Sequence, residues 1–112
     1  MDIKLTKDSD RLICEIYKKY LEKIAENISK SEAKKLGSSK EIHSEIMPEW
    51  FFSDVDEICR ELGRAGLLNC FYADNIVYSA SISDVGIIYM ENRFKNGIKD
   101  VVNYLSNFTS LI

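Results

Sequence analysis

The hydrophobic residues of this chain recur mostly at helical spacing. From Leu12 to Ile28 an apolar residue returns every fourth position, and charged residues lie on the opposite side. Ile13, Tyr17 and Leu21 widen the apolar stripe. Such a stripe predicts a long amphipathic helix over 9–28, capped by Asp8 or Ser9. The stripe is wider than a small domain needs, so we expect part of it to face another subunit.

Two short helices, 30–36 and 39–47, are predicted next. Each follows a serine that has a glutamate three positions later, the spacing at which the serine oxygen accepts from a free backbone amide and the glutamate reaches back. The two pairs are Ser29 with Glu32 and Ser38 with Glu41.

An aromatic run then leads into a fourth helix, 53–65, which Gly66 closes. Trp50, Phe51 and Phe52 stand side by side, and we expect them to fill the core where helices meet, although a surface recognition patch is the alternative. The helix itself carries one apolar face, formed by Val55, Ile58, Cys59 and Leu62.

In residues 67–82, apolar and more polar residues alternate instead of recurring at helical spacing. This pattern predicts an antiparallel hairpin with Asp74 and Asn75 at its turn. The expected pairs are Ala73 with Ile76, Phe71 with Tyr78, Asn69 with Ala80, and Leu67 with Ile82. These residues share a largely apolar face. The other, more polar face holds Leu68, Cys70, Tyr72, Val77, Ser79 and Ser81.

Two helices, 83–94 and 97–110, end the chain. Ser83 is placed to cap the first of them. The apolar face expected of the second is formed by Ile98, Val101, Val102, Leu105, Phe108 and Ile112. The predicted fold is therefore mainly α with a small antiparallel β-hairpin, as one domain over 1–112. We expect the first and last helices to form a homodimer interface.

Composition narrows the possible functions. The net charge is −3, from 18 acidic and 15 basic residues, so the chain lacks the overall basic charge typical of many nucleic-acid binders. No signal peptide or membrane span is evident, which predicts a cytoplasmic protein. Three widely spaced cysteines, Cys14, Cys59 and Cys70, indicate reduced, mostly buried thiols.

Neither a metal site nor catalysis is indicated. His43 has no second histidine to join it in a zinc site, and no phosphate loop, serine elbow or HExxH motif occurs. A thiol paired with His43 is disfavoured because Cys14 and Cys59 lie on apolar stripes. We therefore expect no enzyme activity, no cofactor and no metal.

The segment ISDVGIIYMENRF (82–94) resembles the phrase that follows the wing in winged helix-turn-helix regulators. There the last wing strand ends in an apolar residue, and a capping serine, a glycine and an apolar helix follow. Ile82, Ser83, Gly86, Tyr89 and Met90 fill those places. With the preceding helix and hairpin, the chain is similar to small YjcQ-like or PadR- and MarR-like proteins of bacteria, plasmids and phages.

This resemblance implies double-stranded DNA as a partner, in transcription regulation or in marking a site on a mobile element. The helix before the wing, here 53–65, would enter the major groove. Residues with suitable chemistry lie in three places. They are Lys34, Lys35, Ser38, Ser39 and Lys40 around the 39–47 helix, Arg60 and Arg64 on the 53–65 helix, and Tyr72 and Asn75 on the wing.

Charge argues against the usual docking mode. The outward positions of 53–65 hold four acids against two arginines, and carboxylates near phosphate add repulsion. The two arginines have acidic neighbours along their own helix to pair with, the lysines are typical of a solvated face, and the wing residues suit turn chemistry alone. The alternative function is a protein-interaction module that kept the fold and lost the DNA surface.

Overall fold

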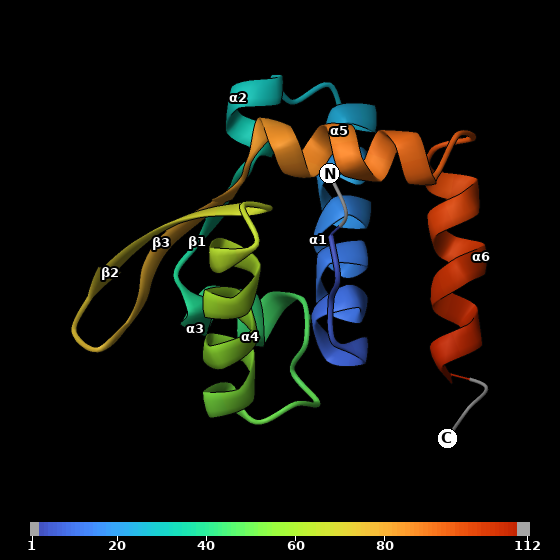
Figure 1. The fold of residues 1–112 in the computed structure, drawn as a ribbon. Coiled ribbons are helices and arrows are strands. Elements are labelled where there is room, and N and C mark those ends of the chain that lie inside the picture. Colours follow the sequence, from blue (N-terminus) through green and yellow to red (C-terminus); the bar gives the residue numbers. More distant parts are fainter. Residues whose placement is uncertain (1–2, 110–112) are drawn as a thin grey trace.

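The computed structural model describes residues 3–109, and the fold is mainly helical with a small antiparallel sheet, as predicted (Figure 1). The elements are α1 (Lys7–Ala25), α2 (Lys30–Ala33), β1 (Lys35–Gly37), α3 (Ser39–Glu45), α4 (Phe52–Arg64), β2 (Leu68–Ala73), β3 (Ile76–Ile82), α5 (Asp84–Arg93) and α6 (Ile98–Thr109). Residue 110 and Ile112, which the sequence analysis places in the last helix, lie outside the described residues.

Side-chain caps set most of the helix starts. Ser38 and Glu41 form the predicted capping box at α3, and Ser83 accepts from the Gly86 amide at 2.9 Å at the start of α5. The predicted cap of α1 is wrong, because Thr6 caps that helix instead. Ser9 turns inward, where its hydroxyl donates to a Glu61 carboxylate oxygen at 2.6 Å.

The sheet has a third strand where the sequence predicts helix. α2 stops after one turn, and β1 pairs antiparallel with β3, giving the strand order β1-β3-β2. The amide of Ile82 donates to the carbonyl of Lys34 at 3.0 Å, and Leu36 is buried. Local capping favours a longer helix here, but pairing with β3 satisfies the backbone and buries Leu36 at the same time.

The predicted hairpin forms, but most of its predicted register is wrong. Asp74 and Asn75 have φ angles of 55° and 62°, as the two-residue turn requires, and Ala73 pairs with Ile76. Next, Tyr72 pairs with Val77 and Phe71 with Ser79, so Tyr78 is an extra bulged residue. The bulge reverses the predicted faces on β2 and at Val77 and Tyr78, whereas Ala80 and Ile82 keep their predicted apolar face. Leu68, Val77, Ala80 and Ile82 are buried, whereas Phe71 and Tyr78 are exposed.

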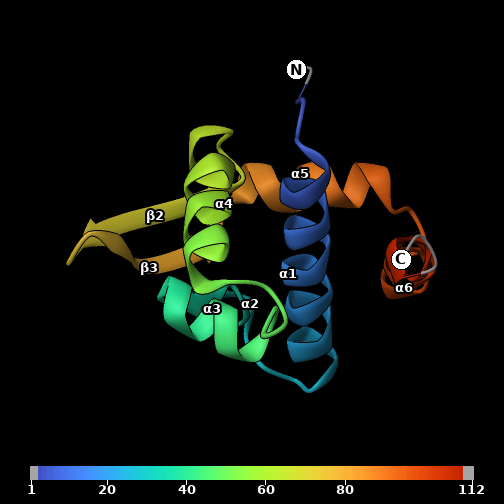
Figure 2. The ribbon, with the colours of Figure 1, turned by 90° about the horizontal axis from the view of Figure 1, so that it is seen from below.

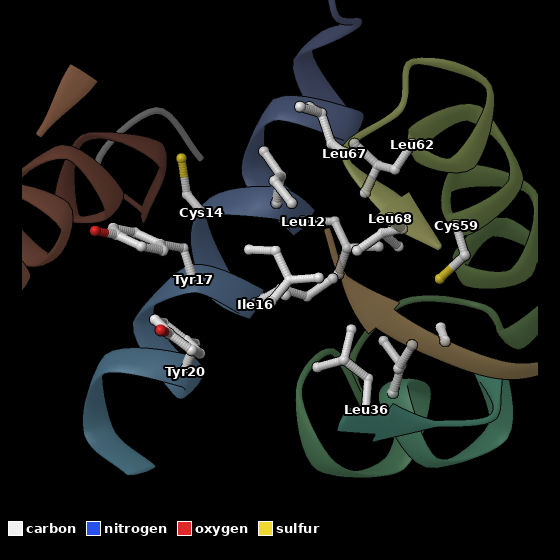
Figure 3. Close-up of a cluster of buried hydrophobic side chains, with 14 of the residues drawn as sticks. Leu12, Cys14, Ile16, Tyr17, Tyr20, Leu36, Cys59, Leu62, Leu67 and Leu68 are labelled. Carbon is white, nitrogen blue, oxygen red and sulfur yellow. The ribbon is translucent and has the colours of Figure 1, made fainter. Parts of the chain in front are cut away.

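The core forms on both sides of α1. In Figures 1 and 2, α1 lies between α4 and α6, and α5 crosses near it. Figure 3 shows Leu12 and Ile16 pointing toward Leu62 and the sheet, whereas Cys14 and Tyr17 point toward α6. The stripe of α1 is wide because two separate layers of the same chain pack against it.

This packing changes the expected dimer interface. The apolar stripe of α1 is largely covered by its own chain, with Tyr17 and Tyr20 buried, so the reason given for an interface on this helix does not hold. On α6, Val101 and Leu105 face the core. The large apolar residues that remain exposed on the last two helices are Val85, Ile88, Ile98 and Val102.

The aromatic run before α4 divides between core and surface. Trp50 and Phe52 are half-buried, and the Phe52 ring meets the His43 ring edge-on at 6.1 Å. Phe51, in contrast, is 78% exposed, so its predicted place in the core is wrong. It is the N-cap residue of α4 and has an extended backbone.

Gly86 provides a test of how tightly the wing base packs on α5. A Cβ atom at this position would lie 2.4 Å from the carbonyl oxygen of Leu67. Gly86→Ala should therefore destabilise the protein by roughly 2 kcal/mol, although alanine is normally the better helix former. Denaturant unfolding measures the change. Asn92→Ala, at an exposed position of the same helix, is the control and should be near neutral; stabilisation by Gly86→Ala would contradict the packing.

Candidate nucleic-acid interface

The residues predicted to contact DNA lie around the start of α3, along α4 and at the wing tip. The hairpin projects outward from the side of the molecule that carries α4 (Figures 1 and 2). The structure places several of these residues close together, but as partners of one another more than as an open surface.

Asp56 binds three of the surrounding groups. Its carboxylate accepts hydrogen bonds from the Ser39 hydroxyl at 2.6 Å, the Val77 amide at 2.8 Å and Nε of Arg60 at 2.9 Å. Asp56 is 9% exposed and Ser39 is fully buried. Ser39 is therefore enclosed in the protein and does not face a phosphate, which corrects its predicted role.

Arg60 connects the same network to the wing. Its NH2 group donates to the Asn75 carbonyl at 2.9 Å, and its guanidinium lies 5.2 Å from the centre of the Tyr72 ring. These contacts fix the wing tip to α4. The pairing of Arg60 along its own helix, the alternative to a DNA contact, is present as the ion pair with Asp56.

The lysines near β1 have acidic partners too. Lys34 Nζ lies 2.6 Å from Asp84, and this hydrogen bond raises the pKa of Lys34 above its ordinary value. Lys35 pairs with Glu32 at 3.1 Å. Both pairs are at the surface, where such bridges contribute little and a phosphate can compete for the lysine.

Two predicted residues remain near these lysines at the start of α3. Ser38 is occupied as the helix cap, whereas Lys40 is exposed. Among residues 3–109, Lys40 is the predicted cation for which no ion pair is found within 4 Å.

The open side of α4 is negative. Asp54 and Glu57 are exposed and Glu61 is half-buried, while Arg64 reaches Glu57 at 3.5 Å. A hollow of about 310 Å³ lies between this side of α4 and the start of α1. Four carboxylates and no cation line it, from Asp8, Asp54, Glu57 and Glu61. This field repels a phosphate backbone.

The wing presents aromatic surface instead of charge. Phe71 and Tyr78 are 62% and 52% exposed, and their rings meet edge-on with centroids 6.4 Å apart. The sequence predicts these two residues as neighbours on the apolar face of the hairpin, but the bulge at Tyr78 turns both of them to the exposed side. The alternating pattern of the sequence contains no mark of this one-residue shift in strand pairing.

A second, half-buried network holds the terminal helix. Asp10 on α1 accepts hydrogen bonds from Arg93 and from the Tyr104 hydroxyl, and one of the Arg93 contacts measures 3.0 Å. Burial raises the pKa of Asp10, but the hydrogen bonds from Arg93 and Tyr104 outweigh this effect and lower it. Arg93 and Asp10 are 83 residues apart in the chain, so no local spacing in the sequence relates them.

Other chemistry receives little support from the described residues. Burial raises the pKa of Cys14 and of Cys59 to about 12, so both thiols stay protonated near neutral pH. His43 makes a 2.7 Å hydrogen bond with the Trp50 carbonyl. Within residues 3–109 no group of three or more potential ligands is placed to hold a metal ion.

Comparison of the chain with protein families, curated proteins and solved structures finds no match. Over the described part of the chain, none of the helices combines the length and the apolar character needed to cross a bilayer.

Asp56→Asn should lower the free energy of unfolding at pH 7 by roughly 2–4 kcal/mol, because the buried donors lose a charged acceptor. Asp54→Asn, two positions away on the exposed side of α4, is the control and should have little effect. Chemical denaturation of both variants and the parent measures the difference.

The same comparison should depend on pH. Burial raises the pKa of Asp56, but hydrogen bonds from Ser39, Val77 and Arg60 outweigh it and lower the pKa. A carboxyl whose pKa is lower in the folded state stabilises that state above its unfolded pKa of about 3.9, and the contribution is lost as pH falls through the folded value. The parent's advantage over Asp56→Asn should shrink below about pH 4. An advantage that persists unchanged into acid would contradict this role.

Proposed function

We propose that this chain is a winged-helix protein. The support is the order of its elements, which apart from the one-turn helix α2 is α1, β1, α3, α4, β2 and β3. The antiparallel strand order is β1-β3-β2, and the hairpin projects beside α4. That order of helices and strands is typical of the class, in which the third helix of the domain precedes the wing. The class most often binds DNA, but a fold alone does not determine function.

Within that class, the proposed function is to bind a protein partner. The observation that carries it is the charge on α4, the helix that would enter a DNA groove. Its open side holds Asp54, Glu57 and Glu61, while Arg60 and Arg64 are engaged by carboxylates of the same helix. A helix so charged gains nothing from a polyanion, whereas exposed Phe51, Phe71 and Tyr78 are typical of protein interfaces.

A second candidate is DNA binding away from α4, and the lysines around β1 and α3 favour it. Lys40 is exposed, and the bridges of Lys34 and Lys35 are weak enough at the surface to yield to phosphate. In this mode the lysines and the wing, with Asn75 at its tip, would contact the DNA phosphate backbone. The protein would then act as a regulator or site-marking factor.

Fluorescence anisotropy with labelled double-stranded DNA separates the two functions. For a protein-binding module we expect no binding tighter than about 10⁻⁴ M at physiological salt, the weak end of non-specific affinity. Neutralising α4 with Asp54→Asn and Glu57→Gln should strengthen the residual binding, because it removes repulsion. Circular dichroism checks that the variant is folded.

The DNA-binding function predicts the opposite pattern. A dissociation constant for DNA below about 10⁻⁶ M, with a steep dependence on salt, would contradict the protein-binding role. In that case Lys34→Glu and Lys40→Glu should each weaken binding and reduce the salt slope by about one. Lys95→Ala, near the end of α5 and far along the chain from this group, is the control.

A further inference from the structure

A continuous groove runs between the start of α1 and the open side of α4. Three hollows of about 200, 310 and 220 Å³ follow one another along it. The first and second share Thr6 and Glu61, and the second and third share Asp8, Asp54 and Ile58. Shared lining residues make the three one surface feature.

The groove is apolar at its base and at one end. Ile58 is 7% exposed and lies beneath both the middle and the last hollow. Trp50 and Phe51 line the last hollow, and Phe51 is the most exposed of the large apolar side chains of the described chain. An aromatic ring held open to solvent beside an apolar floor is typical of an anchor point for a partner.

The walls of the groove select the charge of the occupant. Counting the residues that line its three hollows gives five acids, Asp8, Glu49, Asp54, Glu57 and Glu61, against two cations, Lys4 and Arg64. Both cations line the first hollow, so the charged residues that line the middle and last hollows are all acids. Glu57 and Glu49 make surface pairs with Arg64 and Arg11, whereas Asp8 and Asp54 form no ion pair within 4 Å among the described residues. Complementarity requires cationic side chains there.

We propose that this groove binds a basic segment of a partner protein. Asp54, Glu57 and Glu61 lie on successive turns of α4 and span about 10 Å at 1.5 Å per residue. The fitting segment presents two arginine or lysine side chains one helical turn apart, with an apolar side chain on the same face that packs against Phe51 and Ile58. This inference rests on the proposed protein-binding function and names its site and the chemistry of its partner.

A second copy of the chain fits the groove less well. Two-fold pairing of identical grooves would place carboxylates against carboxylates. Insertion of the chain's own lysine stretch would be a head-to-tail contact, which builds rings or open filaments instead of a simple two-fold dimer. The groove therefore fits a different chain better than its own.

The test uses the whole protein and a fluorescein-labelled helical peptide with two arginines one turn apart and a leucine on the same face. A second peptide has glutamates in place of the arginines. Anisotropy at low salt should show binding of the first peptide and at least tenfold weaker binding of the second.

Variants locate the site. Asp54→Asn with Glu57→Gln should weaken binding of the arginine peptide at least fivefold, and Phe51→Ala should weaken it severalfold. Phe51 is exposed and Asp54 and Glu57 are at the surface, so these variants should fold. Glu26→Gln with Glu91→Gln removes the same net charge at exposed positions of other helices and should leave binding unchanged.

Equal weakening of peptide binding by both double variants would overturn the assignment of the groove as the binding site, since it would show only general attraction to an acidic protein. If the protein binds neither the peptide nor DNA, the groove is not a site for basic segments, and the proposed protein-binding function still stands. Tight DNA binding would instead overturn the proposed function. Sedimentation that shows self-association lost in the Asp54→Asn and Glu57→Gln variant would overturn the partner assignment in favour of a second copy.

Discussion

The carboxylate of Asp56 joins three segments that are far apart in the chain. It accepts from Ser39 at the start of α3, from the backbone of Val77 in β3 and from Arg60 one turn along its own helix. Through Arg60 the same network reaches the turn of the wing at Asn75. A buried carboxylate is costly unless its hydrogen bonds are satisfied, so the arrangement of α3, α4 and the hairpin depends on all three donors being in place.

This dependence has a functional consequence. Ser39, Arg60 and Tyr72 have the chemistry of DNA contacts, yet the Ser39 hydroxyl, the Arg60 guanidinium and the Tyr72 ring are used to hold α3 and the wing against α4. The side of α4 left open is acidic and borders a groove with an apolar floor. The result is a rigid platform whose charge favours cationic partners, which the proposed protein-binding function uses.

A comparable network acts on the other side of α1. Asp10 binds Arg93 and Tyr104 and so holds α5 and α6 against the helix that also carries Leu12 and Ile16 for the opposite layer. In the sequence, an apolar stripe that packs against two layers of its own chain looks the same as one that packs against a single layer and a second subunit. Only the placement of α6 distinguishes the two.

The sequence by itself determined the mainly helical fold, the turn at Asp74 and Asn75 and the caps at Ser38 and Ser83, because each depends on neighbours within a few residues. Only the tertiary structure decided the strand β1, the bulge at Tyr78, the exposure of Phe51 and the burial of Ser39 and Asp56. Each of these is settled by contacts between segments distant along the chain, where burial and hydrogen bonding outweigh local preference. The acidic charge of α4 can be read directly from the sequence. The groove beside it depends on how α1 packs next to α4, which only the tertiary structure shows.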